Sequence, residues 1–275
     1  MIGTSYKSTI ACQVPSIINL AGKFGKARVR KKSKNRGLTN ISKAKITLLH
    51  VTEGKTEEQL ARDFGSNAGS VHRAIILGQQ LLSEYVPGHV TDNEVNGFEK
   101  ALQEAIVKYP EIIEKGYVTI DGTLIHTQNQ YQVGFYSGKH GTNGVKTLAI
   151  ATPSGIPFYF TELVPGSQHD MKMLSDTTVV QTLEDYGIGI VGDKGFQGLD
   201  PEKHLTPVKK TKGGRLTRHQ KEFNYWVTLL RIKVETVFAR IKQYKIMRKC
   251  RQRTKNIPKA FQAALGLHFL EGKTW

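Results

Sequence analysis

The sequence predicts an α/β protein in which a mixed sheet flanked by helices is preceded by a small all-α domain. Short β-type runs, two of which close beside an aspartate, indicate the sheet. A long amphipathic stretch at residues 217–244 indicates a helix that covers the sheet. Two shorter helical patterns separated by a glycine indicate the preceding domain. A chain of 275 residues is long enough for both.

Basic residues are concentrated at the two ends of the chain. Residues 1–50 contain eleven Lys or Arg and no acidic residue, and residues 201–275 contain nineteen against four. The formal net charge is +17, so the middle of the chain is acidic. This segregation suits a protein that contacts a polyanion and holds cations near its centre. A basic protein with a merely solubilising surface is the alternative, and it does not explain the segregation.

Cysteine usage and hydropathy indicate the compartment. The two cysteines, Cys12 and Cys250, have no partner at the spacing of a zinc site or a disulfide framework. Residues 8–22 are uncharged, but polar residues interrupt their apolar run and make a poor signal peptide. No segment approaches the roughly 20 apolar residues of a membrane helix. We therefore expect a cytoplasmic, nucleoid-associated protein with no membrane partner.

Residues 1–40 are predicted to form a loosely ordered basic arm. A run of like charges is typical of a solvated segment, and it is equally suited to contacting phosphates. The side chains expected to make these contacts are Arg28, Arg30, Lys31 and Lys32.

A helix-turn-helix is predicted in residues 41–82, within a DNA-binding domain and connector that spans residues 41–115. The first helix has acidic residues in its first turn and ends before Gly65. The second helix has an apolar stripe formed by Val71, Ala74 and Ile75. Gly78 continues the spacing of that stripe and is the expected end of the helix.

Three polar side chains of the second helix lie away from its apolar stripe: Ser70, His72 and Arg73. Arg73 lies nearly opposite the stripe on a helical wheel. We expect these residues to face a DNA major groove. A short helical hairpin with a glycine corner and no role in DNA binding is the alternative, and the neighbouring basic arm favours the first interpretation.

The large domain is predicted to span residues 116–275. Strands are expected at residues 117–120, 147–151, 158–164, 188–191 and 206–208, and helices at residues 169–186 and 217–244. Three antiparallel strands, a helix, a further strand beside the first and another helix is the element order of an RNase H-like domain.

Acidic residues follow two of these predicted strands. Asp121 follows residues 117–120 and Asp193 follows residues 188–191, so each is expected at the carboxyl end of a buried strand. The last helix can deliver Glu235 from the side. Carboxylate oxygens without nitrogen or sulfur ligands suit Mg²⁺ or Mn²⁺ acting on phosphate esters.

The last helix has an apolar stripe that runs from Phe223 through Trp226 to Tyr244 and is expected to bury it. Glu235 lies off this stripe, on the side of Arg231 and Lys242. A solvated i, i+4 ion pair between Arg231 and Glu235 is the alternative to a site. Coincidence with the two strand-end aspartates favours the site.

At these residues the chain resembles the DDE-superfamily transposases of bacterial insertion sequences, in the branch related to Harbinger elements. The resemblance covers nearly all of residues 41–250. Its motifs, after the helix-turn-helix, are Ile120-Asp121-Gly122-Thr123, Tyr136-Ser137-Gly138-Lys139, Pro165-Gly166-Ser167-Gln168-His169-Asp170, Gly192-Asp193-Lys194-Gly195-Phe196-Gln197-Gly198 and Arg231-x3-Glu235-x6-Lys242. Phe196 and Thr228 stand where a tyrosine is usual, and neither position supplies a carboxylate.

The resemblance implies that Asp121, Asp193 and Glu235 are the catalytic and metal-binding triad, with Arg231 and Lys242 as DNA contacts. It implies two Mg²⁺ or Mn²⁺ ions, cleavage at the ends of an element and transfer of the freed 3′-hydroxyl into target DNA. The implied partner is double-stranded DNA, comprising terminal inverted repeats and target, on which a homo-oligomer assembles.

Three further residues have open interpretations. Asp170 is either a helix first-turn acid or a support for the metal site. Lys209 and Lys210 are either solvated or DNA contacts, and the basic C-terminal third favours contact. Among whole-protein alternatives, a helix-turn-helix regulator with an inactive core would not need the triad. A transposase is the expected function, and a domesticated DNA endonuclease without strand transfer is the alternative.

Overall fold

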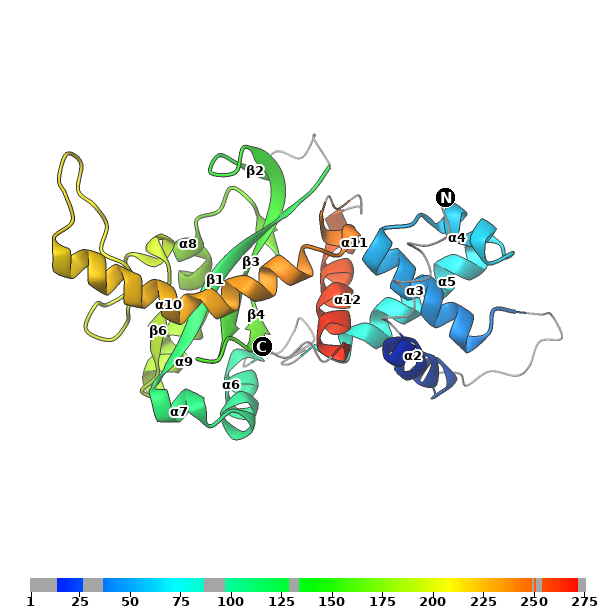
Figure 1. Ribbon diagram of the computed structural model, residues 1–275, viewed down its shortest axis with the longest axis horizontal. Helices are drawn as coiled ribbons and strands as arrows, with labels where there is room; N and C mark the ends of the chain where they lie inside the picture. Colours follow the sequence, from blue (N-terminus) through cyan, green and yellow to red (C-terminus); the bar gives the residue numbers. More distant parts are fainter. Residues whose placement is uncertain are drawn as a thin grey trace. The chain divides into compact units, whose positions relative to one another are not determined.

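The computed structural model describes residues 14–26, 37–86, 97–128, 134–248, 250 and 254–271. Contacts divide these residues into two units (Figure 1). A helical unit combines the described residues up to Val86 with those from Ile241 onward, and an α/β unit contains those from Gly97 to Arg240. None of the helices in the described part of the chain is long and apolar enough to cross a membrane.

The helical unit begins earlier than predicted. Its helices are α2 (Val14–Lys26), α3 (Asn40–Glu53), α4 (Glu57–Asp63), α5 (Ala68–Ser83), α11 (Lys245–Arg248) and α12 (Ile257–Leu270), with a 3-10 turn at Thr254–Asn256. The expectation of a loose arm is wrong for residues 14–26, because α2 buries Ile17, Leu20 and Phe24. The predicted contacts Arg28, Arg30, Lys31 and Lys32 lie outside the described residues.

Helices α4 and α5 occupy the positions predicted for the helix pair. A capping box between Thr56 and Gln59 begins α4, and the Asn67 side chain caps α5 by accepting from the backbone of Ser70. Gly65, at φ +56°, makes the turn between them. The stripe predicted for α5 is buried, in a core shared with Ile46, Leu49 and Leu60. A role of this pair in DNA binding stays a prediction.

Close packing explains two glycines in this unit. Helix α5 does not end at Gly78 as expected, since it continues to Ser83. A Cβ on Gly78 would lie 2.0 Å from Thr47 Oγ1, so glycine is needed where α3 and α5 meet. A Cβ on Gly266 of α12 would lie 1.8 Å from the Leu82 carbonyl oxygen of α5. The C-terminal helix therefore completes the helical unit rather than the large domain to which the sequence assigned it.

The α/β unit contains a mixed sheet and a set of helices. Its strands are β1 (Tyr117–His126), β2 (Tyr136–Ser137), β3 (Thr142–Ala151), β4 (Pro157–Phe160), β5 (Val164–Pro165) and β6 (Gly189–Val191). Its helices are α6 (Gly97–Lys108), α7 (Glu111–Lys115), α8 (Asp170–Ser175), α9 (Val179–Asp185) and α10 (Arg218–Ile241), with a 3-10 turn at Lys194–Phe196. Residues 97–115, expected in the connector of the DNA-binding domain, thus belong to this unit.

The strand order is the one predicted for an RNase H-like domain. Strand β1 pairs antiparallel with β3 and parallel with β6, while β2, β4 and β5 pair antiparallel with β3. The strand expected at residues 206–208 is reduced to a parallel bridge between Leu205 and Val191. The mixed sheet flanked by helices is confirmed.

Helices cover both faces of the sheet (Figure 1). On one face, Val118 and Ile120 of β1 and Leu148 and Ile150 of β3 pack in a core with residues of α6 to α9. On the other face, the small side chains of Ala149 and Ala151 let α10 pack closely through Val234 and Phe238. Alternate residues of β3 thereby serve the two layers.

Candidate active site

Strand register places Asp121 and Asp193 level with each other. Thr119 of β1 pairs with Val191 of β6 in parallel, and each aspartate lies two residues beyond its member of that pair. Strand β6 ends before Asp193, as predicted. Strand β1 does not end at Asp121 but continues to His126 along β3, because β3 extends further than β6. Asp121 therefore stands within a strand, at the point where its β6 neighbour has ended.

Asp121 faces helix α10. It is paired directly with Ala149 in the antiparallel ladder, so the two side chains point to the same side of the sheet. Ala149 packs against Val234 and Phe238 of α10. Arg231, one turn before Val234, consequently reaches Asp121, and its Nη2 donates to Asp121 Oδ1 at 2.8 Å.

The same nitrogen of Arg231 lies 3.1 Å from Glu235 Oε1. The Arg231 side chain is only 8% exposed, whereas that of Glu235 is 48% exposed. The sequence predicted that Arg231 is a DNA contact, with a solvated ion pair as the alternative. The structure buries it between two of the three predicted catalytic carboxylates. The i, i+4 pair exists, but it is part of the site and not an alternative to it.

The apolar stripe of α10 is also displaced from its expected position. The buried positions are Val227, Arg231, Val234, Phe238 and Ile241, whereas Trp226 is 58% exposed. Figure 1 shows the first turns of α10 extending past the sheet. There the Asn224 side chain links the helix to the preceding segment. Its Oδ1 accepts from the Val208 N–H, and its Nδ2 donates to the Val208 carbonyl. The first aromatic residues of the stripe therefore have no sheet to cover.

Burial and neighbouring charge perturb Asp121. Burial raises the pKa of its carboxyl to about 6, with contributions from the negative charges of Glu235 and Asp193, while the Arg231 guanidinium opposes the rise. The three predicted carboxylates are thus close enough to act on one another electrostatically. Within the described ranges, no three His, Cys, Asp or Glu side chains are grouped closely enough to hold a metal ion as they stand. Arg231 stands between Asp121 and Glu235 instead.

Asp193 is held by the turn that follows it. Its Oδ1 accepts from the backbone N–H of Gly195 at 2.7 Å. A Cβ on Gly195 would lie 2.8 Å from Asp193 Oδ1 and 3.0 Å from Asp170 Oδ2. Glycine at this position therefore leaves room for two carboxylates on the same side of the turn.

Asp170 lies against Gly122, the neighbour of Asp121, and against Gly195 in the turn that follows Asp193. Its carboxyl approaches the α8 side of Gly122, and Gly122 pairs with Leu148, whose side chain lies in the core opposite α10. Lys146 Nζ lies 3.2 Å from Asp170 Oδ1 and donates to the Gln168 carbonyl at 2.9 Å. Asp170 thus enters the site as half of a buried ion pair.

Lys146 is a site residue that sequence reasoning missed, because it lies just before the strand predicted at residues 147–151. In the structure it belongs to β3, and its side chain is 9% exposed. The available signal was a lysine inside an apolar run, since lysine is almost never buried without a partner.

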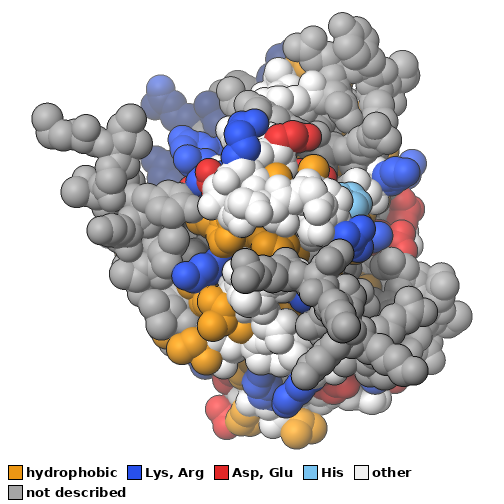
Figure 2. Space-filling model, turned by 90° about the vertical axis from the view of Figure 1, so that its right-hand side faces the viewer, with side chains coloured by type: hydrophobic (Ala, Val, Ile, Leu, Met, Phe, Trp, Pro, Cys, Tyr) orange, Lys and Arg blue, Asp and Glu red, His pale blue; other side chains and the backbone are white. Residues whose placement is uncertain are grey.

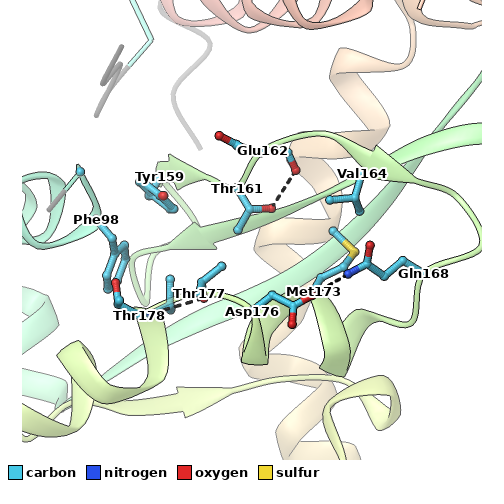
Figure 3. Close-up of a pocket in the computed structure, with 12 residues that line it drawn as sticks. Phe98, Tyr159, Thr161, Glu162, Val164, Gln168, Met173, Asp176, Thr177 and Thr178 are labelled. Atoms are coloured by element: carbon cyan, nitrogen blue, oxygen red, sulfur yellow. Dashed lines mark hydrogen bonds between the residues drawn. The ribbon is translucent and has the colours of Figure 1, made fainter. Parts of the chain in front are cut away.

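A pocket of about 370 Å³ lies on the α8 face of the sheet (Figure 3). Its lining includes Phe98, Tyr159 and Met173, which belong to the core on that face or pack against it. Gln168 also lines it, and its side chain donates to Asp176. The pocket thus lies on the face opposite Asp121 and touches the site only through Gln168.

The other predicted DNA-binding residues that the structure describes do not share an element with Asp121, Asp193 or Glu235. Lys209 and Lys210 are exposed in the segment before α10. Lys242 follows the last residue of α10 and falls in the helical unit.

Ser70, His72 and Arg73 also lie in the helical unit, on α5. Arg73 donates to Ser70 Oγ at 3.2 Å, and His72 Nδ1 lies 2.7 Å from Glu57 Oε1. On the face shown in Figure 2, Lys and Arg side chains are scattered among acidic and apolar ones.

Comparisons with known proteins place this site in a family. Residues 120–268 match the family model of the DDE superfamily endonucleases. A probable transposase for insertion sequence element IS702 from Microchaete diplosiphon is 31% identical over 149 residues. That match covers 53% of this chain and 52% of the relative, so it spans about half the length of each.

Among solved structures, the Mos1 transposase paired-end complex with left transposon end is similar at 12% identity. It covers 92% of this chain and 83% of that one, at a TM-score of 0.25, which is too low to support an argument. The family model, in contrast, covers more than half of the chain and includes Asp121, Asp193 and Glu235. The chain belongs to the DDE superfamily of endonucleases.

Proposed function

We propose that this protein is a DNA transposase that cleaves phosphodiester bonds at the ends of its element and joins the freed 3′-hydroxyl to target DNA. The observation that carries the proposal is that one nitrogen of Arg231 pairs with both Asp121 and Glu235. Asp193 lies level with Asp121, just beyond the end of the neighbouring strand. These three carboxylates are the ones that the DDE resemblance assigns to catalysis. The IS702 relative, named a probable transposase, supports the transposition half of the proposal.

The residues present fit a divalent metal, as endonucleases of this superfamily generally use one. The donors are carboxylate oxygens, the ligands that Mg²⁺ and Mn²⁺ prefer. Because Glu235 and Asp193 both raise the pKa of Asp121, their mutual repulsion would be relieved by a cation among them. We propose that Asp121, Asp193 and Glu235 hold two such ions. When bound, the ions would supply an activated water and stabilise charge on the leaving 3′-oxygen.

The chain's own residues prepare this chemistry. Asp121, with a pKa of about 6, is ionised at neutral pH although it is buried. The Gly195 N–H fixes one oxygen of Asp193 and so orients the other. Glu235 is supplied by the exposed side of α10 and is therefore open to a substrate approaching from solvent. In cleavage, a water oxygen bonds to phosphorus and the P–O3′ bond breaks. In strand transfer, the freed 3′-hydroxyl oxygen bonds to a phosphorus of the target strand, and the P–O3′ bond of the target breaks and leaves a target 3′-hydroxyl.

DNA is the proposed substrate because exposed Lys and Arg side chains lie in the segment before α10 and in its first turn. Between Glu202 and Glu222 the sequence has no acidic residue. The exposed basic side chains in that interval are Lys203, Lys209, Lys210, Lys212, Arg215, Arg218 and Lys221. Such a run provides phosphate contacts independent of sequence, and Arg73 on α5 is proposed to read bases.

A strand-transfer assay separates a transposase from an endonuclease that only cleaves. The substrate is a labelled duplex carrying the inverted repeat found beside the gene, with supercoiled plasmid as target. We expect Mg²⁺- or Mn²⁺-dependent joining of the duplex 3′-end to the plasmid. Nicked end duplex without joined product, under conditions in which precut ends are also supplied, would support the domesticated endonuclease instead.

A further inference from the structure

Arg231 occupies an unusual position for a helix residue of a metal-dependent nuclease. A single nitrogen, Nη2, is 2.8 Å from Asp121 Oδ1 and 3.1 Å from Glu235 Oε1. One positively charged donor therefore stands between two carboxylates that arrive from different elements, β1 and α10. A divalent ion shared by those carboxylates would require the same space and the same oxygens.

The environment of Arg231 is incompletely satisfied. Its side chain is 8% exposed, and its Nε is buried without a hydrogen-bond partner among the described residues. A buried donor without an acceptor costs free energy, and the attraction of the two carboxylates offsets that cost. Removing that attraction would leave the guanidinium with little reason to remain buried.

We propose that Arg231 is an internal counter-cation that holds Asp121 and Glu235 until these carboxylates take up divalent metal, whereupon its guanidinium leaves them. The inference rests on the proposed metal-dependent function. It makes Arg231 a competitor of the metal, which lowers the affinity of the site and keeps the carboxylates from repelling one another before metal binds.

The alternative role for Arg231 is that of a fixed scaffold. The two roles predict opposite changes in metal affinity when Arg231 is replaced. If Arg231 only positions the carboxylates, its removal disorders them and weakens metal binding. If Arg231 competes, its removal strengthens metal binding. Catalytic rate does not separate the roles, because both make the residue important for cleavage, so the readout is metal affinity.

The test is Mn²⁺ binding measured by electron paramagnetic resonance of free Mn²⁺, with the full chain and no DNA. We expect Arg231→Gln to bind Mn²⁺ about tenfold more tightly than wild type, the scale of removing one competing charge interaction. Arg218→Gln is the matched control, since Arg218 is exposed on the same helix, and it should bind as wild type does. Unchanged or weaker binding by a folded Arg231→Gln protein overturns the inference.

Two further measurements keep the outcome interpretable. In wild-type protein labelled with ¹⁵N-arginine, the exchange-protected side-chain signal of Arg231 should lose its protection when Ca²⁺ saturates the site. Retained protection overturns the inference even if the glutamine variant does not fold. Asp193→Asn tests the underlying function separately: if wild type does not bind Mn²⁺, or if Asp193→Asn binds it as tightly as wild type, the proposed function fails, whatever Arg231 does.

Discussion

At the scale of single residues, the site depends on one buried aspartate whose charge is both costly and useful. Asp121 must be ionised to bind Arg231 or a cation, and burial beside Glu235 and Asp193 opposes that ionisation. A pKa near 6 means that the carboxylate is formed at neutral pH at a cost in stability. This electrostatic cost is typical of functional positions, where perturbed pKa values concentrate.

This cost predicts a pH dependence of stability for the metal-free protein. The folded-state pKa of Asp121, about 6, is above the ordinary value of 3.8. Between these values the folded state binds more protons than the unfolded state, so stability falls as pH rises and the loss is complete above pH 6. Its upper limit is about 3 kcal/mol.

Denaturant unfolding of wild type and Asp121→Asn after chelation checks this prediction. The asparagine variant lacks the titrating group. Between pH 4.5 and pH 7.5, wild type should therefore lose more free energy of unfolding than Asp121→Asn does. An identical change with pH in the two proteins would mean that Asp121 titrates normally. The pH-independent difference between them reports the lost contact with Arg231.

At the scale of elements, two packing relations bring the carboxylates together. Parallel pairing of β1 with β6 sets Asp121 level with Asp193. Packing of α10 on Ala149 and Ala151 brings Arg231 and Glu235 over Asp121. The helix is thus anchored at Val234 and Phe238, immediately beside the residue that it supplies to the site.

Replacing an anchor should therefore cost both stability and activity. Phe238→Ala removes a buried ring that lies 6.5 Å from the Phe160 ring, centroid to centroid, and is expected to destabilise the protein by about 3 to 5 kcal/mol. Ile232→Ala is the matched control on the same helix, since Ile232 is 52% exposed and should cost less than about 0.5 kcal/mol. Denaturant midpoints measure both. Equal midpoints would contradict the packing of α10.

Sequence periodicity predicted where helices and strands lie better than it predicted which of their faces are buried. It found the stripe of α5, four of the five predicted strands and the long helix α10, because these patterns are local. It misplaced the stripe of α10, since whether Trp226 or Val227 is buried depends on where the sheet stops beneath the helix. It also missed Lys146. A lysine within a strand suggests burial, but its partner Asp170 lies far along the chain and is found only in the folded structure.

At the scale of the whole molecule, composition indicated a polyanion partner but not which residues meet it. The three acidic residues stand in a recognisable order along the chain, and their assignment as a catalytic triad comes from the resemblance and stays a prediction. The assignment of α12 to the helical unit was beyond the sequence, because it depends on a long-range contact between Gly266 and Leu82. Chain order alone had placed residues 241 onward with the catalytic unit.

We predict that different residues supply the sequence preference and the sequence-independent affinity of DNA binding. Arg73→Ala should lower the preference for the end sequence over random duplex by about 1 to 3 kcal/mol, as expected for a base contact. A Lys209→Gln, Lys210→Gln double variant should weaken binding to both duplexes equally and reduce the salt-dependence slope by about two. Fluorescence anisotropy at several salt concentrations measures both effects. An equal loss on the two duplexes for Arg73→Ala would make it a phosphate contact.

The central claim is that Asp193 acts with Asp121 and Glu235 in metal-dependent cleavage of DNA. Its most direct test is single-turnover cleavage of an end duplex in Mn²⁺ by wild type, Asp193→Asn and Asp185→Asn, with duplex binding measured in parallel. Asp185, an exposed aspartate of the same unit, is the control. We predict that Asp193→Asn binds the duplex normally and cleaves it slower by a factor on the order of 10³, while Asp185→Asn behaves as wild type. Cleavage by Asp193→Asn at the wild-type rate would contradict the assignment of the site.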